Sequence, residues 1–272
     1  MKNVLISICF IICFASCTRS IDEVNSPPIY IEMETELGRI LIQLFDETPL
    51  HRDNFKQLAH DGYYDSLQFH RIIEHFVIQA GDPESKTFPF PSDIGSGGLD
   101  YTIPAEFHPT IFHKRGTVGM ARDDNPNRAS SSTQFYIVQG RVQTDSTLTL
   151  AEDRINGWLA RYYVRTAPEN QPLLDAIETY MALGDTLNLT KANSQLNDLI
   201  ASFTDFPLYT IPDEHRTVYK TLGGIPHLDQ NYTIFGEVIQ GMHIVDEFAK
   251  VETDSADRPL NPARILFMRV VE

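Results

Sequence analysis

The chain has 272 residues, of which 42% are hydrophobic and 22% charged, proportions typical of a globular protein with a buried core. Its 22 basic and 37 acidic residues give a formal net charge of -15. This charge disfavours a nucleic-acid partner, because phosphate binding needs a concentrated basic surface. A solvated acidic surface that keeps the protein soluble explains it more simply than selection of basic partners.

The first 17 residues form an element of their own before the fold. Lys2 supplies a short positive region, and residues 4–14 form an apolar run too short for an ordinary membrane span. The chain continues Phe14-Ala15-Ser16-Cys17, which resembles the lipobox of a bacterial lipoprotein signal. The resemblance implies that Cys17 becomes the lipidated N-terminus and anchors the protein to a membrane; an ordinary cleaved secretory peptide is the alternative.

Cysteine usage supports export. Every cysteine of the chain lies in this first segment: Cys9, Cys13 and Cys17. The rest of the chain therefore cannot form a disulfide in an oxidising compartment. Residues 18–28 are polar and end in two prolines, which predicts a tether. We expect a soluble body in the bacterial cell envelope, periplasmic or surface-facing, and Thr18 after the lipidated position favours the outer membrane.

The next elements show strand and helix patterns in turn. Residues 30–45 predict a β-hairpin, because apolar residues alternate on both sides of the turn Glu36-Leu37-Gly38. Thr48-Pro49 is typical of a helix start, and Gly62 ends that helix. Two segments follow, a strand pattern over 69–80 and a glycine-rich loop over 92–100.

After two further strands, at 117–120 and 134–138, the pattern becomes helical from 141 to 221. Thr149-Leu150-Ala151-Glu152 matches a capping box and predicts the start of the first helix. The other helices are expected around 173–181, closed by Gly184, around 192–203, and from a cap at Asp213. The chain then closes with a strand at 232–238, a helix at 241–248 and a strand at 265–271.

This order predicts a β-rich domain interrupted by a helical block. Residues 29–140 and 222–272 form the β-rich part, and 141–221 form the insertion. Without the insertion, the β-rich part has a size typical of one compact domain.

Residues 69–82 are the most unusual segment, because Arg71 and Gln79 stand in a run of mostly apolar, strand-forming residues. Arginine keeps its charge and is almost never fully buried without a partner. A guanidinium fixed at the rim of an apolar surface can hold an amide group that is itself being desolvated. This combination suits chemistry on a peptide bond without any nucleophile.

Four blocks occur in a fixed order: residues 69–82, 116–122, 131–137 and 227–236. Together they resemble the conserved blocks of the cyclophilin-type peptidyl-prolyl cis-trans isomerases. The resemblance implies a mainly β fold, an eight-stranded antiparallel β-barrel capped by two helices, with residues 141–221 as an inserted α-helical subdomain. It also implies cis–trans isomerisation of X-Pro bonds in exported polypeptides, which assists their folding.

The resemblance assigns roles to ten residues. Arg71 is the catalytic residue that stabilises the twisted amide, and Gln79 orients Arg71 and binds the substrate backbone. No covalent step is needed, only preferential binding of the twisted state over a barrier of roughly 18–20 kcal/mol. The positions that bind substrate are Phe76, Val77, Ala121, Arg122, Gln134, Tyr136, Leu228 and Tyr232.

Three departures from the family pattern leave Arg71 and Gln79 intact. Glu74-His75 stands where a glycine commonly precedes the phenylalanine, and Ser132 replaces a usual glycine. His227 stands where many eukaryotic members have tryptophan, which disfavours binding of the drug cyclosporin.

Other chemistries find little support, and we predict no metal and no cofactor. The nine histidines include no His-Glu-x-x-His helix, and His70 is interpreted as a structural hydrogen-bonding residue. The run Ser130-Ser131-Ser132 lacks the Gly-x-Ser-x-Gly turn of a hydrolase nucleophile.

Two alternatives stay open. The chain is either an enzyme or a non-catalytic cyclophilin-like peptide-binding module or chaperone; intact Arg71 and Gln79 favour the enzyme. The insertion over 141–221 is either a helical flap beside the groove that recognises clients, or a peripheral bundle without a role in binding.

Overall fold

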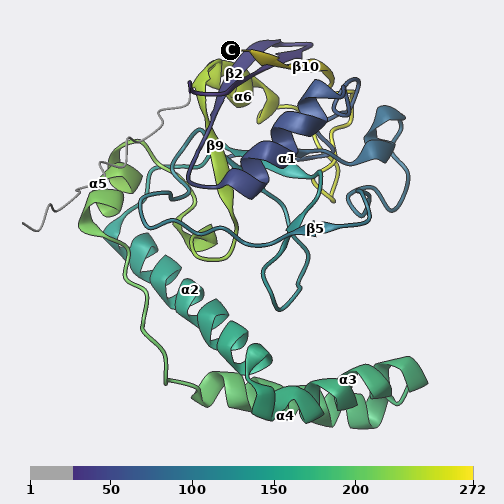
Figure 1. Ribbon diagram of the computed structural model, residues 1–272, viewed down its shortest axis with the longest axis vertical. Helices are drawn as coiled ribbons and strands as arrows, with labels where there is room; N and C mark the ends of the chain where they lie inside the picture. Colours follow the sequence, from purple (N-terminus) through teal and green to yellow (C-terminus); the bar gives the residue numbers. More distant parts are fainter. Residues whose placement is uncertain (1–26, 272) are drawn as a thin grey trace, which may run out of the picture.

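A computed structural model describes residues 27–271; the expected signal, with Cys17, and most of the tether lie outside these residues. The body is an eight-stranded antiparallel sheet in the order β10-β1-β2-β9-β6-β8-β4-β3, which curls into a barrel (Figure 1). Its strands are β1 (Tyr30–Thr35), β2 (Gly38–Leu44), β3 (Arg71–Ile73), β4 (Val77–Ala80), β6 (Thr117–Met120), β8 (Phe135–Val138), β9 (Ile234–Gln240) and β10 (Ile265–Val271). A separate short ladder pairs β5 (Thr102–Ile103) with β7 (Ser130–Ser131).

Two helices, α1 (Pro49–His60) and α6 (Met242–Phe248), contribute to the barrel core. Phe55 of α1 and Phe248 of α6 are fully or almost fully buried in the same cluster as the inward-facing strand residues. The predicted fold, an eight-stranded antiparallel barrel capped by two helices, is therefore confirmed. The remaining helices are α2 (Asp145–Thr166), α3 (Gln171–Leu183), α4 (Thr186–Ser202) and α5 (Asp213–Thr221), with 3₁₀ turns η1 (Pro83–Lys86), η2 (Pro168–Asn170) and η3 (Pro226–Leu228).

The two strands at the ends of the sheet order, β10 and β3, approach each other where both strands begin. The backbone N–H of Phe69 donates to the carbonyl of Ala263 at 2.9 Å, and that of Ile265 donates to Leu67 at 2.8 Å. These two bonds flank an isolated bridge between Gln68 and Arg264. The barrel thus closes through a short contact rather than a full strand ladder.

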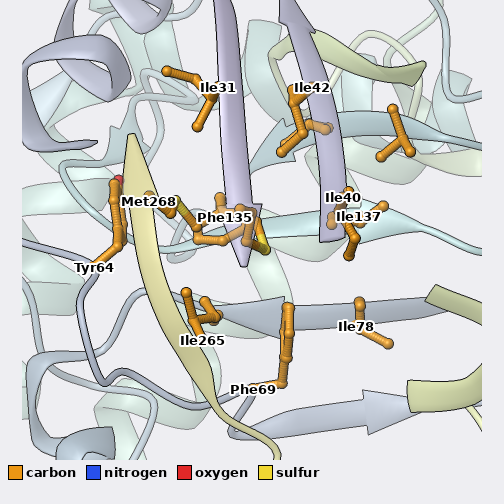
Figure 2. Close-up of a cluster of buried hydrophobic side chains, with 14 of the residues drawn as sticks. Ile31, Ile40, Ile42, Tyr64, Phe69, Ile78, Phe135, Ile137, Ile265 and Met268 are labelled. Atoms are coloured by element: carbon orange, nitrogen blue, oxygen red, sulfur yellow. The ribbon is translucent and has the colours of Figure 1, made fainter. Parts of the chain in front are cut away.

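Alternation along β1 and β2 supplies one side of the barrel core. In β1 every second residue is buried, and Ile31 and Met33 are fully enclosed. Figure 2 shows Ile31, Ile40 and Ile42 projecting from their strands into this interior. Side chains at alternate positions of a strand share one face, so the apolar period of two in the sequence becomes a continuous core.

The segment 69–80 is two strands, not the single strand that the pattern predicted. Strands β3 and β4 form a hairpin, and its turn contains Glu74 and His75. Phe76 N–H donates to the carbonyl of Ile73 at 3.1 Å, and His75 has a positive φ of 65°. A residue in the left-handed conformation allows so tight a turn to reverse the chain. The turn was not predicted because apolar residues alternate on both sides of it.

The first helix of the block begins earlier than the predicted capping box at Thr149. Thr144 caps α2 and forms a capping box with Thr147, so Thr149 lies inside the helix. At the other end of the block, Pro212 holds the cap position of α5 and Asp213 is its first helical residue. Gly184 ends α3 in the left-handed conformation, as the sequence predicted.

Helix α2 runs from the barrel to the α3–α4 pair, which lies apart from the sheet (Figure 1). Within that described pair, only Ala192 is buried. The first half of α2 packs instead beside the barrel, where Leu148 and Ala151 share a cluster with Tyr219 of α5. Among residues 27–271, no helix is both long and apolar enough to cross a bilayer.

A narrow neck joins this helical excursion to the barrel. Gly224 N–H donates to the carbonyl of Arg141 at 3.0 Å, and a Cβ added to Gly140 would lie 2.6 Å from the Gly224 Cα. The two ends of the excursion therefore meet backbone to backbone, at a point where only glycine fits.

Candidate active site

A row of paired residues crosses four neighbouring strands. Arg71 pairs with Gln79, Gln79 with Tyr136, and Tyr136 with Gly119. Directly paired residues have their side chains on the same face of a sheet. The row lies on the outer face, because the intervening Ile72 and Ile78 point into the core. A side chain at Gly119 would collide with the ring of Tyr136, so this glycine allows the ring to lie across β6.

Arg71 is held in place but remains accessible. Its Nη1 donates to Oε1 of Gln79 at 3.3 Å, and its Nε lies 3.9 Å from a carboxylate oxygen of Asp257. The guanidinium carbon lies 5.9 Å from the centroid of the Phe76 ring. Since 40% of the Arg71 side chain is exposed, its N–H groups can reach a molecule bound beside them.

A chain of amides fixes the orientation of Gln79. Its Nε2 donates to Oε1 of Gln134 at 3.0 Å, and Nε2 of Gln134 donates to the carbonyls of Gly95 and Gly97 at 2.9 and 2.8 Å. Because the Gln134 nitrogen faces two carbonyls, its oxygen must face Gln79. Gln79 therefore turns its own oxygen toward Arg71. The glycine-rich loop thus sets the orientation of both glutamine amides.

A cavity of about 130 Å³ lies beside this row, and we call it the proline cavity. Its lining consists of nine of the ten residues predicted from the sequence: Arg71, Phe76, Val77, Gln79, Ala121, Arg122, Tyr136, Leu228 and Tyr232. The tenth, Gln134, lies behind Gln79. The cavity is smaller than sites for drug-sized ligands, which measure roughly 300–1,000 Å³. It has room for about one side chain.

Aromatic rings form the apolar walls of the proline cavity. The ring of His227 stacks parallel to Phe76, with centroids 5.8 Å apart, and Tyr232 meets Tyr136 edge to face at 6.1 Å. Burial lowers the pKa of His227 to about 4. His227 is therefore neutral at pH 7, and its ring supports the Phe76 wall without lining the cavity itself.

A buried network supports the floor of the cavity. Nε2 of His113 lies 2.8 Å from the hydroxyl of Tyr136, and Nδ1 lies 2.8 Å from Asp229. The hydroxyl of Tyr219, on α5, donates to the other oxygen of Asp229 at 2.7 Å. Because the carboxylate accepts the Nδ1 proton, Nε2 of a neutral imidazole accepts from Tyr136. The network thus connects the helical block to the proline cavity.

Comparison with known proteins identifies the family. Residues 30–167 and 211–270 match the family model described as "Cyclophilin type peptidyl-prolyl cis-trans isomerase/CLD". The chain belongs to the cyclophilin-type peptidyl-prolyl cis-trans isomerases. It is an enzyme of this class, as the sequence predicted.

Relatives support this assignment. The chain is 28% identical over 251 residues, 92% of its length and 95% of the relative's, to a Staphylococcus aureus (strain USA300) protein named "Putative peptidyl-prolyl cis-trans isomerase". A Staphylococcus saprophyticus protein of the same name is 27% identical over the same length. The crystal structure of a Cryptosporidium parvum cyclophilin matches with a TM-score of 0.53 at 18% identity, covering 90% of this chain and 98% of that one. The same cyclophilin in the presence of the dipeptide Ala-Pro matches with a TM-score of 0.52. At this identity the likeness concerns the fold.

Trp158 lies beside the proline cavity and was not predicted from the sequence. It is the single tryptophan of the chain and lies on α2. Its ring meets His227 and Tyr232 with centroids 6.5 and 6.4 Å away, and it packs against the apolar cluster that includes Leu228. Where many eukaryotic cyclophilins have a tryptophan, this chain has His227 with Trp158 beside it. No spacing rule connects two residues so far apart in the sequence.

The structure explains the departure at Ser132 and describes the surroundings of His70. The hydroxyl of Ser132 accepts from Leu99 N–H at 3.0 Å and donates to the Leu99 carbonyl at 3.1 Å, so it ties the glycine-rich loop to the groove. His70 is buried, but neither ring nitrogen has a hydrogen-bond partner in the described part of the chain. Its expected hydrogen-bonding role stays a prediction; the ring fills space beneath Gly95.

One group of three residues resembles the Ser-His-acid triad of a hydrolase. Nε2 of His51 lies 2.9 Å from the Ser130 hydroxyl, and Nδ1 lies 2.7 Å from Glu106. Ser130 and His51 are both completely buried, so a substrate has no access to the hydroxyl. The arrangement instead ties α1 to the β5–β7 region.

Proposed function

We propose that this cyclophilin isomerises X-Pro bonds of exported proteins and that Arg71 stabilises the twisted amide. The observation that carries the proposal is the guanidinium of Arg71 at the rim of a cavity for one apolar side chain. A proline ring fits such a cavity, and its amide then lies within reach of the guanidinium.

The physical reason lies in amide resonance. The planar X-Pro bond resists rotation by roughly 18–20 kcal/mol, and uncatalysed exchange takes tens to hundreds of seconds. In the twisted state the amide nitrogen regains its lone pair and can accept a hydrogen bond that the planar amide does not accept. An N–H of Arg71 that donates there binds the transition state more strongly than the ground state, which is the requirement for catalysis.

Gln79 and the aromatic walls complete the mechanism. Gln79 keeps the Arg71 guanidinium in one orientation, so that little reorganisation accompanies the rotation. The walls hold the ring and exclude water, which strengthens the hydrogen bond. A reduction of the barrier by about 5.5 kcal/mol gives roughly a 10⁴-fold acceleration.

The test is isomerisation of a short proline peptide, followed by NMR exchange without a coupled protease. We expect Arg71→Ala to lower kcat/KM about 10²- to 10³-fold, the effect of removing one preorganised donor. Arg39→Ala is the matched control, since Arg39 is exposed on β2 and pairs only with the surface residue Glu32 in the described chain. Background rates for both wild type and Arg71→Ala contradict the enzyme and favour a non-catalytic binding module or chaperone.

We also propose that the protein is anchored in the cell envelope, with the outer membrane favoured, where it meets exported clients. Support comes from the order Phe14-Ala15-Ser16-Cys17 and from the absence of cysteine after Cys17 in the sequence. A labelled fatty acid fed to expressing cells should enter the full-length protein and not Cys17→Ser, and the labelled form should fractionate with the outer membrane. Equal labelling of both forms excludes Cys17 as the anchor.

A further inference from the structure

A second cavity, of about 320 Å³, adjoins the proline cavity. Arg122 and Tyr232 line both cavities, so they form a shared wall. One side is the loop 122–128, and the other is a face of α2. We call this cavity the α2 pocket and define it by Arg122, Arg128, Trp158, Arg161, Tyr162 and Arg165.

The α2 pocket is basic although the protein is acidic. Four arginines line it against two aspartates, Asp123 and Asp124, in a chain with a formal net charge of -15. Among the described residues, Arg165 is the one lining arginine in an ion pair, with Asp124 at 3.4 Å. Asp123 accepts from the side-chain amide of Asn125 at 2.6 Å. The pocket thus has a local excess of positive charge.

Two of these arginines are fixed before any ligand binds. Arg128 lies over the ring of Tyr162 at 3.8 Å and donates to the Gln230 carbonyl at 2.8 Å. Arg122 donates to Asn231 at 2.9 Å and to the Asn125 carbonyl at 2.7 Å. In each of these arginines, Nε is buried and lacks a hydrogen-bond partner in the described chain. Guanidinium groups fixed in this way suit the planar geometry of a carboxylate.

The aromatic side of the pocket connects it to the peptide groove. Trp158 lines the α2 pocket and also packs against the apolar cluster of Val77, Tyr136 and Leu228 at the proline cavity. Arg161 and Arg165 lie one and two turns further along the same face of α2. A peptide that leaves the proline cavity past Tyr232 therefore meets an indole ring and then guanidinium groups.

We propose that the α2 pocket binds the carboxylate of an aspartate or glutamate in the polypeptide whose proline occupies the proline cavity. This inference rests on the proposed function, because it assigns a preferred substrate class to the same site. The enzyme then selects proline segments with an acidic residue nearby, and α2 supplies the part of the recognition surface that binds this acidic residue.

The first experiment uses alanine-based peptides with one proline and a single Glu, Gln or Lys at each of the three positions before and after it. Turnover is followed by NMR exchange, and binding by the fluorescence of Trp158, the single tryptophan. At one or more positions we expect the Glu peptide to bind about three- to fivefold more tightly than its Gln counterpart at low ionic strength, and the Lys peptide to bind more weakly. The preference should shrink in 1 M salt.

Charge reversal identifies the residues responsible. Arg161 is exposed, so Arg161→Glu is expected to fold, and it should reduce the ratio of Glu to Gln peptide affinity to one or below. Lys191→Glu on α4 is the matched control, with the same change of charge at an exposed position away from the pocket, and should keep the wild-type ratio.

Failure of this inference differs from failure of the proposed function. Turnover of Gln and Glu peptides with equal affinities at all positions overturns the acidic subsite and leaves the isomerase intact. Tighter binding of Glu peptides without turnover of any peptide overturns the proposed catalysis and upholds the pocket. An unchanged Glu preference in Arg161→Glu overturns the assignment to α2.

Discussion

At the scale of single residues, the closest contact that orients Arg71 is a neutral amide and not a carboxylate. Arg71 faces an amide oxygen of Gln79 at 3.3 Å, while the nearest carboxylate oxygen, on Asp257, lies 3.9 Å from Nε. A close carboxylate holds a guanidinium in a bidentate pair and occupies its donors. An amide orients the group and leaves donors for the substrate.

Replacement of Gln79 by glutamate tests this point. In Gln79→Glu a carboxylate pairs with Arg71 and also faces Oε1 of Gln134, so that two acceptors meet where a hydrogen bond had been. We expect kcat/KM for a proline peptide to fall about tenfold, equivalent to about 1.4 kcal/mol. Gln195→Glu, the same change on the exposed face of α4, should leave it unaltered. Wild-type turnover in Gln79→Glu contradicts an orienting role for the neutral amide.

Sequence motifs predicted residues that lie close in the chain or in known blocks, and missed those brought together only by folding. Nine of the ten predicted side chains line one cavity because they occur in blocks that form adjacent strands. The contacts of His113 with Asp229, and of Asp229 with Tyr219, link residues that no local periodicity relates. Trp158 was not predicted for the same reason, because its spacing in the helix is equally typical of a core residue.

At the scale of secondary-structure elements, the β3–β4 turn explains a departure from the family pattern. His75 has the left-handed conformation that a glycine adopts without strain, and its N–H donates to Oε1 of Gln139. The sequence showed the missing glycine but not the turn, because Ile72, Ile73, Val77 and Ile78 read as one apolar strand. The structure therefore assigns backbone strain, and no loss of a site side chain, to this position.

A matched pair of substitutions measures that strain. His75→Gly and His75→Ala remove the same exposed ring, but only alanine keeps the Cβ that disfavours a positive φ. We expect the glycine variant to have a free energy of unfolding about 1 kcal/mol higher than the alanine variant. Urea unfolding of both proteins provides the measurement. A more stable alanine variant means that the turn relaxes to a different conformation.

At the scale of the whole molecule, buried histidines make stability depend on pH. Burial lowers the pKa of His70 to about 4, and burial likewise lowers the pKa of His227 to about 4. In the unfolded chain both titrate near a pKa of about 6.5. Between these values the unfolded state binds more protons than the folded state, so stability is complete above about pH 6.5 and is lost as pH falls toward 4.

His70 should account for a large share of this loss because only 3% of it is exposed. We expect about 2–3 kcal/mol of its contribution to disappear between pH 7 and pH 4.5. His70→Asn, which cannot take up the proton, should show a correspondingly smaller fall in the free energy of unfolding over that range, measured by urea titration at each pH. An equal fall in the free energy of unfolding of the wild type and of His70→Asn means that another group causes the acid sensitivity.

The neck at Gly140 and Gly224 brings the two ends of the helical excursion together, so that the excursion is a closed loop on the barrel. The entropy of closing a loop rises only with the logarithm of its length, by about 0.6 kcal/mol for each doubling. The α3–α4 pair, which lies apart from the sheet and buries only Ala192 among its described residues, can therefore change in length with little effect on the barrel's stability. The outer helices can then vary while the contacts of α2 and α5 with the proline cavity stay in place.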